Sequence, residues 1–251
     1  MTNPLFDPES RIVIAHRGNS ARMPENTIEA LHSAVELGAD AVEYDVRITR
    51  DGVPVLMHDA TLDRTTSGQG LLLEADMAHV RELDAGRAVT AWRGPRVAVP
   101  TLEEVLDRFR ATPAVIEVKE PGAVEPTVRL IHKLGLQGSV VLGSDNLQVM
   151  SGLNRSGLRT IASRTEAMIL IPMALAGMAP RAAQYSVLSV TPRYRGFPIP
   201  VMRMTMAARE AGIPTHVWTV NDPVAALAYW RGGVSGIVTD DPDAMLRTRP
   251  R

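Results

Sequence analysis

Short apolar runs alternate with longer amphipathic stretches along the whole chain. The apolar runs are rich in β-branched residues and have the length of single strands, whereas the stretches between them repeat apolar residues at helical spacing. Strict alternation of this kind indicates that the strands pair in parallel. The predicted strands are Ile12–Ala15, Ala41–Val46, Val115–Val118, Val140–Gly143, Thr160–Ser163, Ser186–Val190, Thr215–Thr219 and Gly236–Thr239. The clearest helical stretches are Thr27–Leu37, Leu102–Phe109 and Val201–Ala211.

Eight parallel strands are enough to close a barrel, so we predict an α/β fold, a (β/α)8 TIM barrel. The chain of 251 residues has the length of one such domain, and residues 1–251 are expected to form a single barrel domain. A doubly wound open sheet would satisfy the same alternation. However, no Gly-x-Gly-x-x-Gly turn follows the first predicted strand, as a dinucleotide-binding sheet requires.

The segment after the second predicted strand departs from this pattern. Val53–Met57 is also strand-like, and the preceding Asp51-Gly52 pair is a strong signal for a tight hairpin, which predicts an antiparallel arm. Residues 59–100 then interrupt the alternation with turn-forming residues such as Gly68, Gly70 and Gly94. We expect them to form a small insertion after the second strand that covers the barrel mouth.

Composition narrows the function classes. The formal net charge of -1 argues against a nucleic acid or an anionic membrane surface as the main partner, since both select a basic footprint. The absence of cysteine excludes disulfides, thiolate ligands and a cysteine nucleophile, and it fits a cytoplasmic protein. The start of the chain, Met1–Arg11, lacks the apolar centre of a signal peptide. The most apolar run, Ala167–Ala179, is broken by Pro172 and is too short to cross a bilayer, so we predict a buried helix there and no stable membrane insertion.

Acidic residues occupy two of the predicted strands. Glu43 and Asp45 lie two residues apart, and because strand side chains alternate, both carboxylates share one face. Glu117 adds a third carboxylate from the next barrel strand. Clustered negative charges in a low-dielectric interior are costly unless a cation binds among them, and an all-oxygen ligand set suits Mg²⁺ or Ca²⁺ rather than zinc. The alternatives are an exposed strand with a polar face and a structural ion pair between Glu117 and Lys119.

His16-Arg17-Gly18 ends the first predicted strand. A histidine at that end of a barrel can act as an acid or a base near neutral pH, and an arginine fork matches phosphate oxygens. If Asp51 and Gly52 form a two-residue turn, Arg50 pairs with Val53, and the same register sets Asp45 opposite His58. This register would bring His58 beside the carboxylates.

A few further side chains have simpler interpretations. Asn26 directly precedes an amphipathic helix, and we predict that it is the N-cap of that helix. Glu25 is left without a predicted role. The remaining histidines have no partner pattern and are expected at the surface or in the core: His32, His79, His132 and His216.

Several motifs in this chain resemble those of the glycerophosphodiester phosphodiesterases. They occur in order and span nearly the whole chain, and they are specific for that superfamily. They are Ile14–Gly18, Pro24–Thr27, Gly38–Val46, Thr49–Gly52, His58-Asp59, Pro100–Leu106, Ile116–Lys119, Val217–Asn221 and Thr239-Asp240.

The resemblance implies the (β/α)8 barrel, with residues 59–100 as the insertion typical of the family. It also implies that His16 and His58 form a general acid–base pair. The same likeness implies that Glu43, Asp45 and Glu117 hold one divalent cation, Mg²⁺ or Ca²⁺.

Substrate binding is implied for three further residues. Arg17 and Lys119 would bind the phosphate, and Trp218 would line the pocket at the end of the seventh strand. The correspondence weakens at Gly143–Asp145, where the family often has Ser-Phe, and this difference bears on substrate choice. Residues 163–198 carry no family motif.

The expected activity is metal-dependent hydrolysis of a small-molecule glycerophosphodiester to glycerol 3-phosphate and an alcohol. The alternative within the superfamily is a lysophospholipase D or another phospholipase-like enzyme, for which Leu71–Leu73 could form part of an apolar channel. Outside the superfamily, the same residues could serve a non-catalytic phosphate-ligand binder or a barrel isomerase or aldolase. An isomerase or aldolase would need a Schiff-base lysine in an apolar pocket or a lone carboxylate base, whereas Lys119 lies next to charge. The alcohol, the choice of metal, the nucleophile (water or the glycerol 2-hydroxyl) and the oligomeric state are left open by the sequence.

Overall fold

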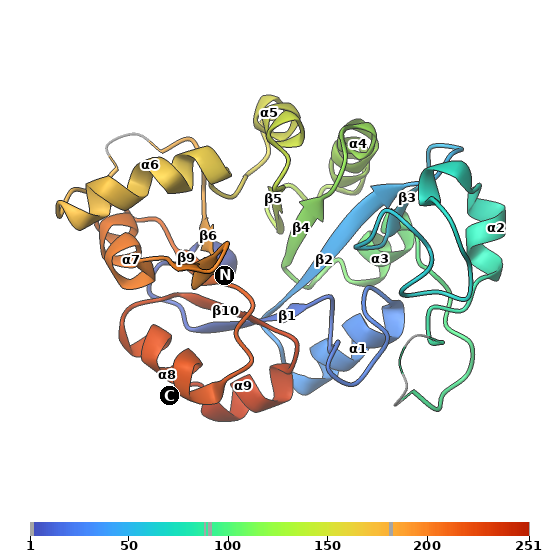
Figure 1. The fold of residues 1–251 in the computed structure, drawn as a ribbon, viewed down its shortest axis with the longest axis horizontal. Coiled ribbons are helices and arrows are strands. Elements are labelled where there is room, and N and C mark those ends of the chain that lie inside the picture. The colour runs from blue at the N-terminus through green and yellow to red at the C-terminus, as the bar shows by residue number, and fades with distance from the viewer. Residues whose placement is uncertain (1–2, 88, 90–91, 181–182, 251) are drawn as a thin grey trace.

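Strands and helices alternate along the chain in the computed structural model, which describes residues 3–87, 89, 92–180 and 183–250 (Figure 1). The strands are β1 Ile12–His16, β2 Ala41–Ile48, β3 Pro54–Leu56, β4 Ala114–Val118, β5 Val140–Gly143, β6 Leu188–Val190, β7 Arg193–Tyr194, β8 Phe197–Pro198, β9 Thr215–Val217 and β10 Gly236–Thr239. The α-helices are α1 Ile28–Leu37, α2 Met77–Glu82, α3 Leu102–Arg108, α4 Val124–Leu134, α5 Leu147–Arg155, α6 Arg164–Leu175, α7 Val201–Glu210, α8 Pro223–Arg231 and α9 Pro242–Thr248. Short 3-10 helices cover Pro4–Phe6, Leu72–Glu74 and Pro121–Ala123.

The main sheet is parallel and curls into the predicted barrel. Its strands follow the order β5-β4-β2-β1-β10-β9-β6. Two single bridges, Leu142 to Thr160 and Ile161 to Val187, connect the edge strands through residues 160–161. The fifth predicted strand, Thr160–Ser163, is thus reduced to two bridging residues. Ser163 ends it, because its side chain and that of Glu166 form the capping box that starts α6.

The antiparallel arm is present, but its predicted register is wrong by one residue. β3 pairs with β2 so that Val46 lies opposite Leu56, and the Met57 amide donates to the Asp45 carbonyl oxygen at 3.1 Å. His58 is therefore not opposite Asp45, and Val53 pairs with Thr49 rather than Arg50. The turn contains three residues with Gly52 at φ +79°, a geometry in which the left-handed glycine adds one residue to the two-residue turn.

The insertion, residues 59–100, has a hydrophobic cluster of its own beside β3. Leu62, Leu72, Val80 and Val99 are buried there against Val55 of the arm. Figure 1 places this segment, with α2, on the opposite side of the molecule from α6 and α7. Its described residues do not line the main pocket, and their covering of the barrel mouth stays a prediction.

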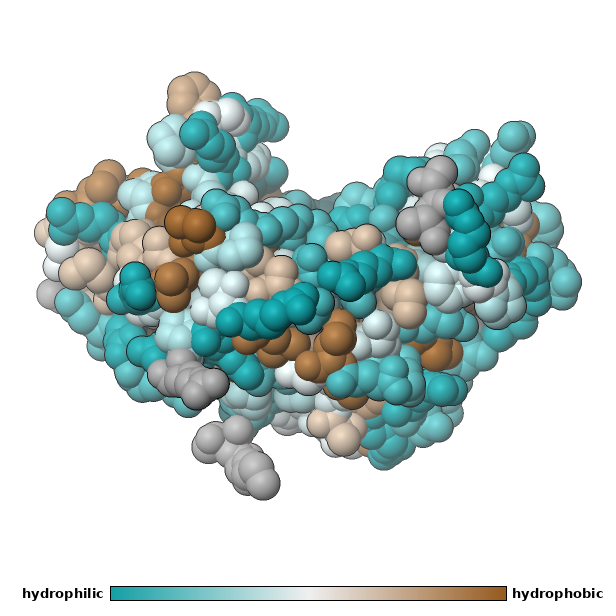
Figure 2. Space-filling view, turned by 90° about the horizontal axis from the view of Figure 1, so that it is seen from below, coloured by the Kyte–Doolittle hydropathy of each residue, from teal (hydrophilic) through white to brown (hydrophobic). Residues whose placement is uncertain are grey.

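The apolar stretch Ala167–Ala179 is not the buried helix that we predicted. Its apolar residues surround α6 on all sides, so the helix packs one side against the protein and leaves the other in solvent. Met168 is 52%, Ile169 58% and Leu175 60% exposed. Figure 2 shows hydrophobic residues at the surface on the side where Figure 1 places α6 and α7. Among the described residues, no helix has both the length and the apolar character needed to span a membrane.

The half of the barrel interior toward the N-terminal ends of the strands is filled by apolar side chains. Ile12, Ile14, Val115 and Val238 meet there, and Leu5 from the chain start packs against them. This layer supports the opposite end of the barrel, at the C-terminal ends of the strands, where the inward positions of the same strands are polar. The barrel interior is therefore a packed core, with polar side chains at the C-terminal ends of its strands.

Among the described residues, His216 is the one buried imidazole, and its burial makes the stability of the fold depend on pH. It is 1% exposed, and burial lowers its pKa from 6.5 to about 4. The folded protein keeps the ring neutral, so stability is complete above pH 6.5 and falls as the pH drops toward 4. Urea unfolding should show a loss of about 2 kcal/mol from this group between pH 7 and pH 5. The His216→Gln variant should lack that part of the pH dependence, and an unchanged slope would contradict the assignment.

Candidate active site

Inward-pointing side chains change from apolar to polar along β1 and β2 toward the C-terminal ends of these strands. On β1 the series is Ile12, Ile14, His16, and on β2 it is Ala41, Glu43, Asp45. The parallel register sets His16 beside Glu43 and Asp45 beside Glu117. Alternation along the strands and the stagger between them therefore gather chemically active groups at one end of the barrel.

Three carboxylates form the centre of this end. Oxygen atoms of Glu43, Asp45 and Glu117 all lie within 4.8 Å of one another. Glu43 is 6% and Asp45 0% exposed. Oxygen ligands of one cation bound at about 2.4 Å are at most about 5 Å apart, so this spacing fits a single Ca²⁺ and, after a small contraction, Mg²⁺. We call these three residues the acidic triad.

The acidic triad carries more negative charge than its surroundings balance. Burial raises the pKa of Glu43 to about 7, and the charge of Asp45 adds to this effect. Burial also raises the pKa of Glu117. For Asp45, burial opposes ionisation, but the charges of Lys119 and Arg17 outweigh it and lower the pKa. Two of the three acids are thus held unfavourably as anions, which is the electrostatic condition that a bound cation relieves.

Two cationic side chains reach the acidic triad. Lys119 Nζ lies 2.8 Å from Asp45 Oδ1 and 2.8 Å from Glu117 Oε2. Arg17 Nε lies 3.0 Å from Asp45 Oδ2, and its Nη1 donates to Glu25 at 2.9 Å. Both cations also line the pocket, so they can face an anionic ligand while they remain anchored to carboxylates.

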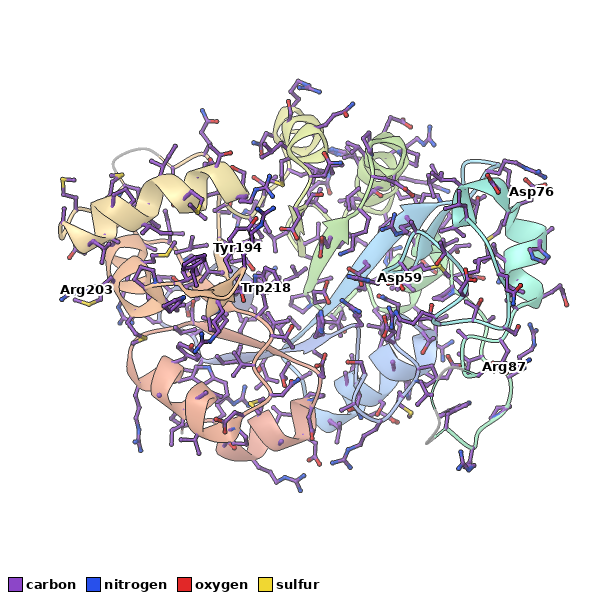
Figure 3. The ribbon with its side chains drawn as sticks, in the orientation of Figure 1. Asp59, Asp76, Arg87, Tyr194, Arg203 and Trp218 are labelled. Atoms are coloured by element: carbon purple, nitrogen blue, oxygen red, sulfur yellow. The ribbon has the colours of Figure 1, made fainter. Side chains whose placement is uncertain are left out.

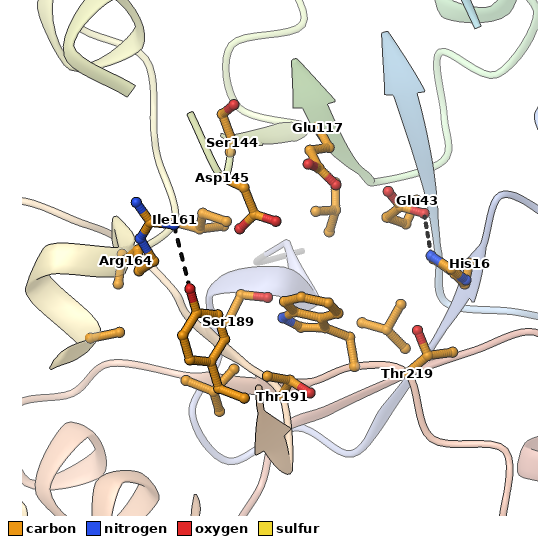
Figure 4. A pocket seen from close by; sticks show the side chains of 18 of the residues that line it. His16, Glu43, Glu117, Ser144, Asp145, Ile161, Arg164, Ser189, Thr191 and Thr219 are labelled. Atoms are coloured by element: carbon orange, nitrogen blue, oxygen red, sulfur yellow. Dashed lines mark hydrogen bonds and ion pairs between the residues drawn. The ribbon is translucent and has the colours of Figure 1, made fainter. Parts of the chain in front are cut away.

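His16 is held by a carboxylate from the last strand. Its Nδ1 lies 2.6 Å from Asp240 Oδ1, and Asp240 also accepts from Asn221 at 2.6 Å. Although burial opposes ionisation of Asp240, its hydrogen bonds with His16 and Asn221 lower its pKa to about 2. An ionised carboxylate only accepts, so the Nδ1 of His16 carries the proton of this bond and its Nε2 is left for other partners. That Nε2 lies 3.8 Å from Glu43 Oε2 (Figure 4).

His58, which also lines the pocket, has a matching arrangement. Its Nδ1 lies 2.6 Å from Asp59 Oδ1. Arg64 donates to both oxygens of Asp59, at 2.7 and 2.9 Å, and these bonds hold the pKa of Asp59 well below its usual range. Arg64 also pairs with Glu25, which joins this group to Arg17. Each histidine thus has Nδ1 bound to an aspartate, and neither Nε2 has a hydrogen-bond partner in the described part of the chain.

All predicted site residues except Asp45 line one pocket, and Asp45 lies buried beneath it among the acids. Trp218 follows β9 and is half-buried at the pocket wall. Figure 3 shows Trp218 and Tyr194 on one side of the molecule and Asp59 on the other. The lining of the pocket also includes apolar side chains, among them Ile161, Ile171 and Met204.

Asn26 has a different role from the one that we predicted. Thr27, not Asn26, is the N-cap of α1, because its Oγ1 accepts from the Ala30 amide. Asn26 has φ +58° and binds Asp45 with both ends of its amide, at 2.9 and 3.1 Å. Gly18 has φ +84°, and a Cβ there would lie 2.5 Å from the Ala30 backbone. This glycine lets α1 approach the site.

Three carboxylate or amide partners of the site residues were not identified by sequence reasoning: Asn26, Asp59 and Asp240. Asp240 directly follows a predicted apolar strand, which is also the position at which His16 was identified, and the same criterion would have found Asp240. Asp59 carries a weaker signal, since it only follows a candidate histidine. Nothing in the local pattern links Asn26 to Asp45, because that contact joins a loop to a different strand.

Comparison with known proteins gives one consistent result. A model of the glycerophosphoryl diester phosphodiesterase family matches residues 16–244. The chain is 32% identical over 243 residues to a glycerophosphodiester phosphodiesterase of Caldanaerobacter subterraneus, covering 94% of this chain and 96% of that protein. It is 31% identical to one from Bacillus subtilis, covering 98% and 88%.

Solved structures agree with this result. A glycerophosphodiester phosphodiesterase from Agrobacterium tumefaciens is similar with a TM-score of 0.77 at 28% identity, covering 94% of this chain and 99% of that one. A phosphodiesterase of Oleispira antarctica, solved in complex with the product sn-glycerol-3-phosphate, is similar with a TM-score of 0.76 at 25% identity, covering 94% and 96%.

Proposed function

This chain belongs to the glycerophosphoryl diester phosphodiesterase family, and on that basis we propose that it hydrolyses a glycerophosphodiester to glycerol 3-phosphate and an alcohol. The observation that carries the proposal is the convergence of His16 and His58 on one pocket beside the acidic triad. The product seen in the Oleispira antarctica relative supports the choice of glycerol 3-phosphate.

The acidic triad would hold one divalent cation, Mg²⁺ or Ca²⁺. When bound, such an ion polarises the phosphorus centre and neutralises charge on a non-bridging oxygen. Asn26 keeps Asp45 oriented, and Lys119 spans Asp45 and Glu117 from the pocket side. These contacts hold the carboxylates in place before substrate arrives, which limits the reorganisation that binding requires.

Arg17 and Lys119 would bind the phosphate. A phosphodiester is an anion that repels nucleophiles, and both cations line the pocket close to the acidic triad. Both side chains contact Asp45, which is buried and stays in place when a substrate enters the pocket. The contact with Asp45 therefore anchors both cationic groups, which can stabilise the charge that develops on phosphate oxygens in the transition state.

The two histidines would divide the proton transfers. One Nε2 removes a proton from the nucleophile, which is water or the glycerol 2-hydroxyl, and the other donates a proton to the departing alkoxide. If the 2-hydroxyl attacks first, the cyclic phosphate that forms is then hydrolysed by water to glycerol 3-phosphate. Asp240 and Asp59 keep both rings in the tautomer that this division needs. Because the pair must start in opposite protonation states, activity would follow a bell-shaped pH curve.

The apolar part of the pocket lining favours a second candidate activity, the lysophospholipase D type, in which the substrate carries an acyl chain. This part comprises Ile161, Ile171, Ile199 and Met204, and a small polar alcohol would leave these side chains without an apolar partner. The second candidate uses the same reacting groups and differs only in the part of the substrate that contacts these apolar side chains.

Product analysis tests the proposed function and separates the two candidates. The enzyme with Mg²⁺ or Ca²⁺ should release glycerol 3-phosphate and free choline from glycerophosphocholine. Release of phosphocholine instead would show cleavage on the other side of phosphorus and would contradict the proposal. Lysophosphatidylcholine, assayed in parallel, should be the better substrate only if the second candidate is correct, and the His58→Ala variant serves as the inactive control for both.

A further inference from the structure

The near-neutral total charge conceals a strong segregation along the chain. Residues 155–209 contain eight arginines and a single acidic residue, Glu166, which gives this segment a formal charge of +7. Because the whole chain has a formal charge of -1, the residues outside this segment have a formal charge of -8. Glu166 is already engaged, because its carboxylate accepts from the backbone and hydroxyl of Ser163 at the start of α6. This segment has no acidic side chain left to pair with its arginines.

Three of these arginines lie in or next to the lining of the pocket: Arg164 lines it, and Arg193 and Arg195 flank Tyr194, which also lines it. Arg164 begins α6, and Arg193 and Arg195 belong to the β7–β8 hairpin. All three are exposed, and none forms an ion pair within the described part of the chain. Arg164 Nη1 lies 3.5 Å from the Tyr194 hydroxyl, a contact drawn in Figure 4 that joins the helix to the hairpin. Arg164 and Tyr194 both line the pocket.

Exposed apolar side chains accompany these arginines. Phe197 in the hairpin is 75% exposed, and Met168 and Ile169 on α6 are 52% and 58% exposed. Met168 also lines the pocket, so the apolar surface continues into the proposed active site. Single exposed apolar residues are ordinary, but a group that is bordered by unpaired cations and adjoins a binding pocket indicates an interaction surface. We call Arg164, Met168, Ile169, Arg193, Arg195 and Phe197 the arginine rim.

We propose that the arginine rim docks the protein on an anionic lipid surface, with the mouth of the pocket facing that surface. The arginines supply attraction to anionic headgroups, and Phe197, Met168 and Ile169 enter the boundary between headgroups and acyl chains. Nucleic acid would match the charge but not the aliphatic side chains. An acidic protein would match the charge as well, and a failure of the chain to bind anionic vesicles would favour that partner instead. The proposal does not depend on the hydrolytic reaction.

Vesicle co-sedimentation tests this proposal with the intact protein. The chain should bind vesicles of phosphatidylcholine mixed with phosphatidylglycerol and should stay in solution with vesicles of phosphatidylcholine alone. Added NaCl should weaken binding, since the Debye length shortens from about 10 Å at 0.1 M to about 3 Å at 1 M. The double variant Arg193→Gln/Arg195→Gln should bind about 25-fold more weakly, roughly fivefold for each arginine. Phe197→Ser should weaken binding by about tenfold through lost apolar contact.

A charge-matched control distinguishes the arginine rim from a general effect of net charge. Arg81→Gln/Arg129→Gln removes two exposed arginines from α2 and α4, where each pairs with an exposed glutamate. This control should bind vesicles like the unchanged protein. Equal weakening in the control and rim variants, or no binding of the unchanged protein to anionic vesicles, would overturn the proposal. Hydrolysis of water-soluble glycerophosphocholine should be unaffected by Arg193→Gln/Arg195→Gln, so failure of docking and failure of the proposed function are separate outcomes.

Discussion

Replacing His16 or His58 by alanine is expected to lower kcat on a glycerophosphodiester by about 100-fold to 10,000-fold, the range for loss of a general acid or base. Each ring has its Nδ1 fixed on an aspartate 2.6 Å away, so only Nε2 is free to exchange a proton with substrate. Because both rings would act in the same reaction, the double variant should be only slightly slower than the worse single variant. Steady-state rates at several pH values give the measurement.

The control for this experiment is His79→Ala, which removes an exposed imidazole from α2. It should leave both kcat and the unfolding midpoint in urea unchanged. His58 is partly exposed, so its alanine variant should also keep the midpoint of the unchanged protein. Near-normal rates in both His16→Ala and His58→Ala, in correctly folded protein, would end the acid–base assignment. A loss in one variant alone would assign catalysis to a single histidine and contradict the paired mechanism.

Removal of divalent cations should abolish activity, and the Glu43→Gln variant should reproduce that loss while it stabilises the metal-free protein. Burial and the charge of Asp45 raise the pKa of Glu43 to about 7, so above that pH the ionised side chain lowers the free energy of unfolding. The protonated side chain is the form that the folded protein favours. The contribution of Glu43 to stability is therefore complete below its ordinary pKa of 4.5 and is lost as the pH rises through 7. At pH 8 without cation, Glu43→Gln should therefore gain roughly 1–3 kcal/mol.

Thermal unfolding measures the binding of the cation independently of enzyme turnover. With Mg²⁺ or Ca²⁺ at about 100 times its dissociation constant, the Tm of the unchanged protein should rise by roughly 5–10 °C. Glu43→Gln should show little of this rise. The matched control, Glu125→Gln on α4, removes an exposed carboxylate and should keep both the rise in Tm and the activity. If the unchanged protein shows no rise and EDTA has no effect on its activity, the acidic triad is not a cation site.

Much of the fold could be predicted because it is encoded locally. The alternation of strand and helix patterns identified the barrel, and the two-residue spacing of Glu43 and Asp45 placed both carboxylates on the inward face. His16 and Glu117 were found for the same reason, since each lies near the C-terminal end of an apolar strand. A period of two along a strand survives folding, so it can be interpreted without knowledge of the neighbours.

Other features depended on contacts between distant segments. The register of the β2–β3 arm was wrong by one residue because Asp-Gly fits both a two-residue turn and the three-residue turn that formed here. Asn26 has the composition of a helix cap, but its loop brings it to Asp45, where its amide satisfies a buried carboxylate. Residue type alone does not distinguish these outcomes.

The sequence by itself determined the class of fold, the kinds of reacting group and the end of the barrel at which they gather, because periodicity and strand direction are properties of short segments. Only the tertiary structure decided which carboxylate orients each histidine, which cations neutralise Asp45, and that α6 exposes its apolar residues beside unpaired arginines. Electrostatic and packing energies depend on distances between groups far apart in the chain, and closure of the barrel sets those distances.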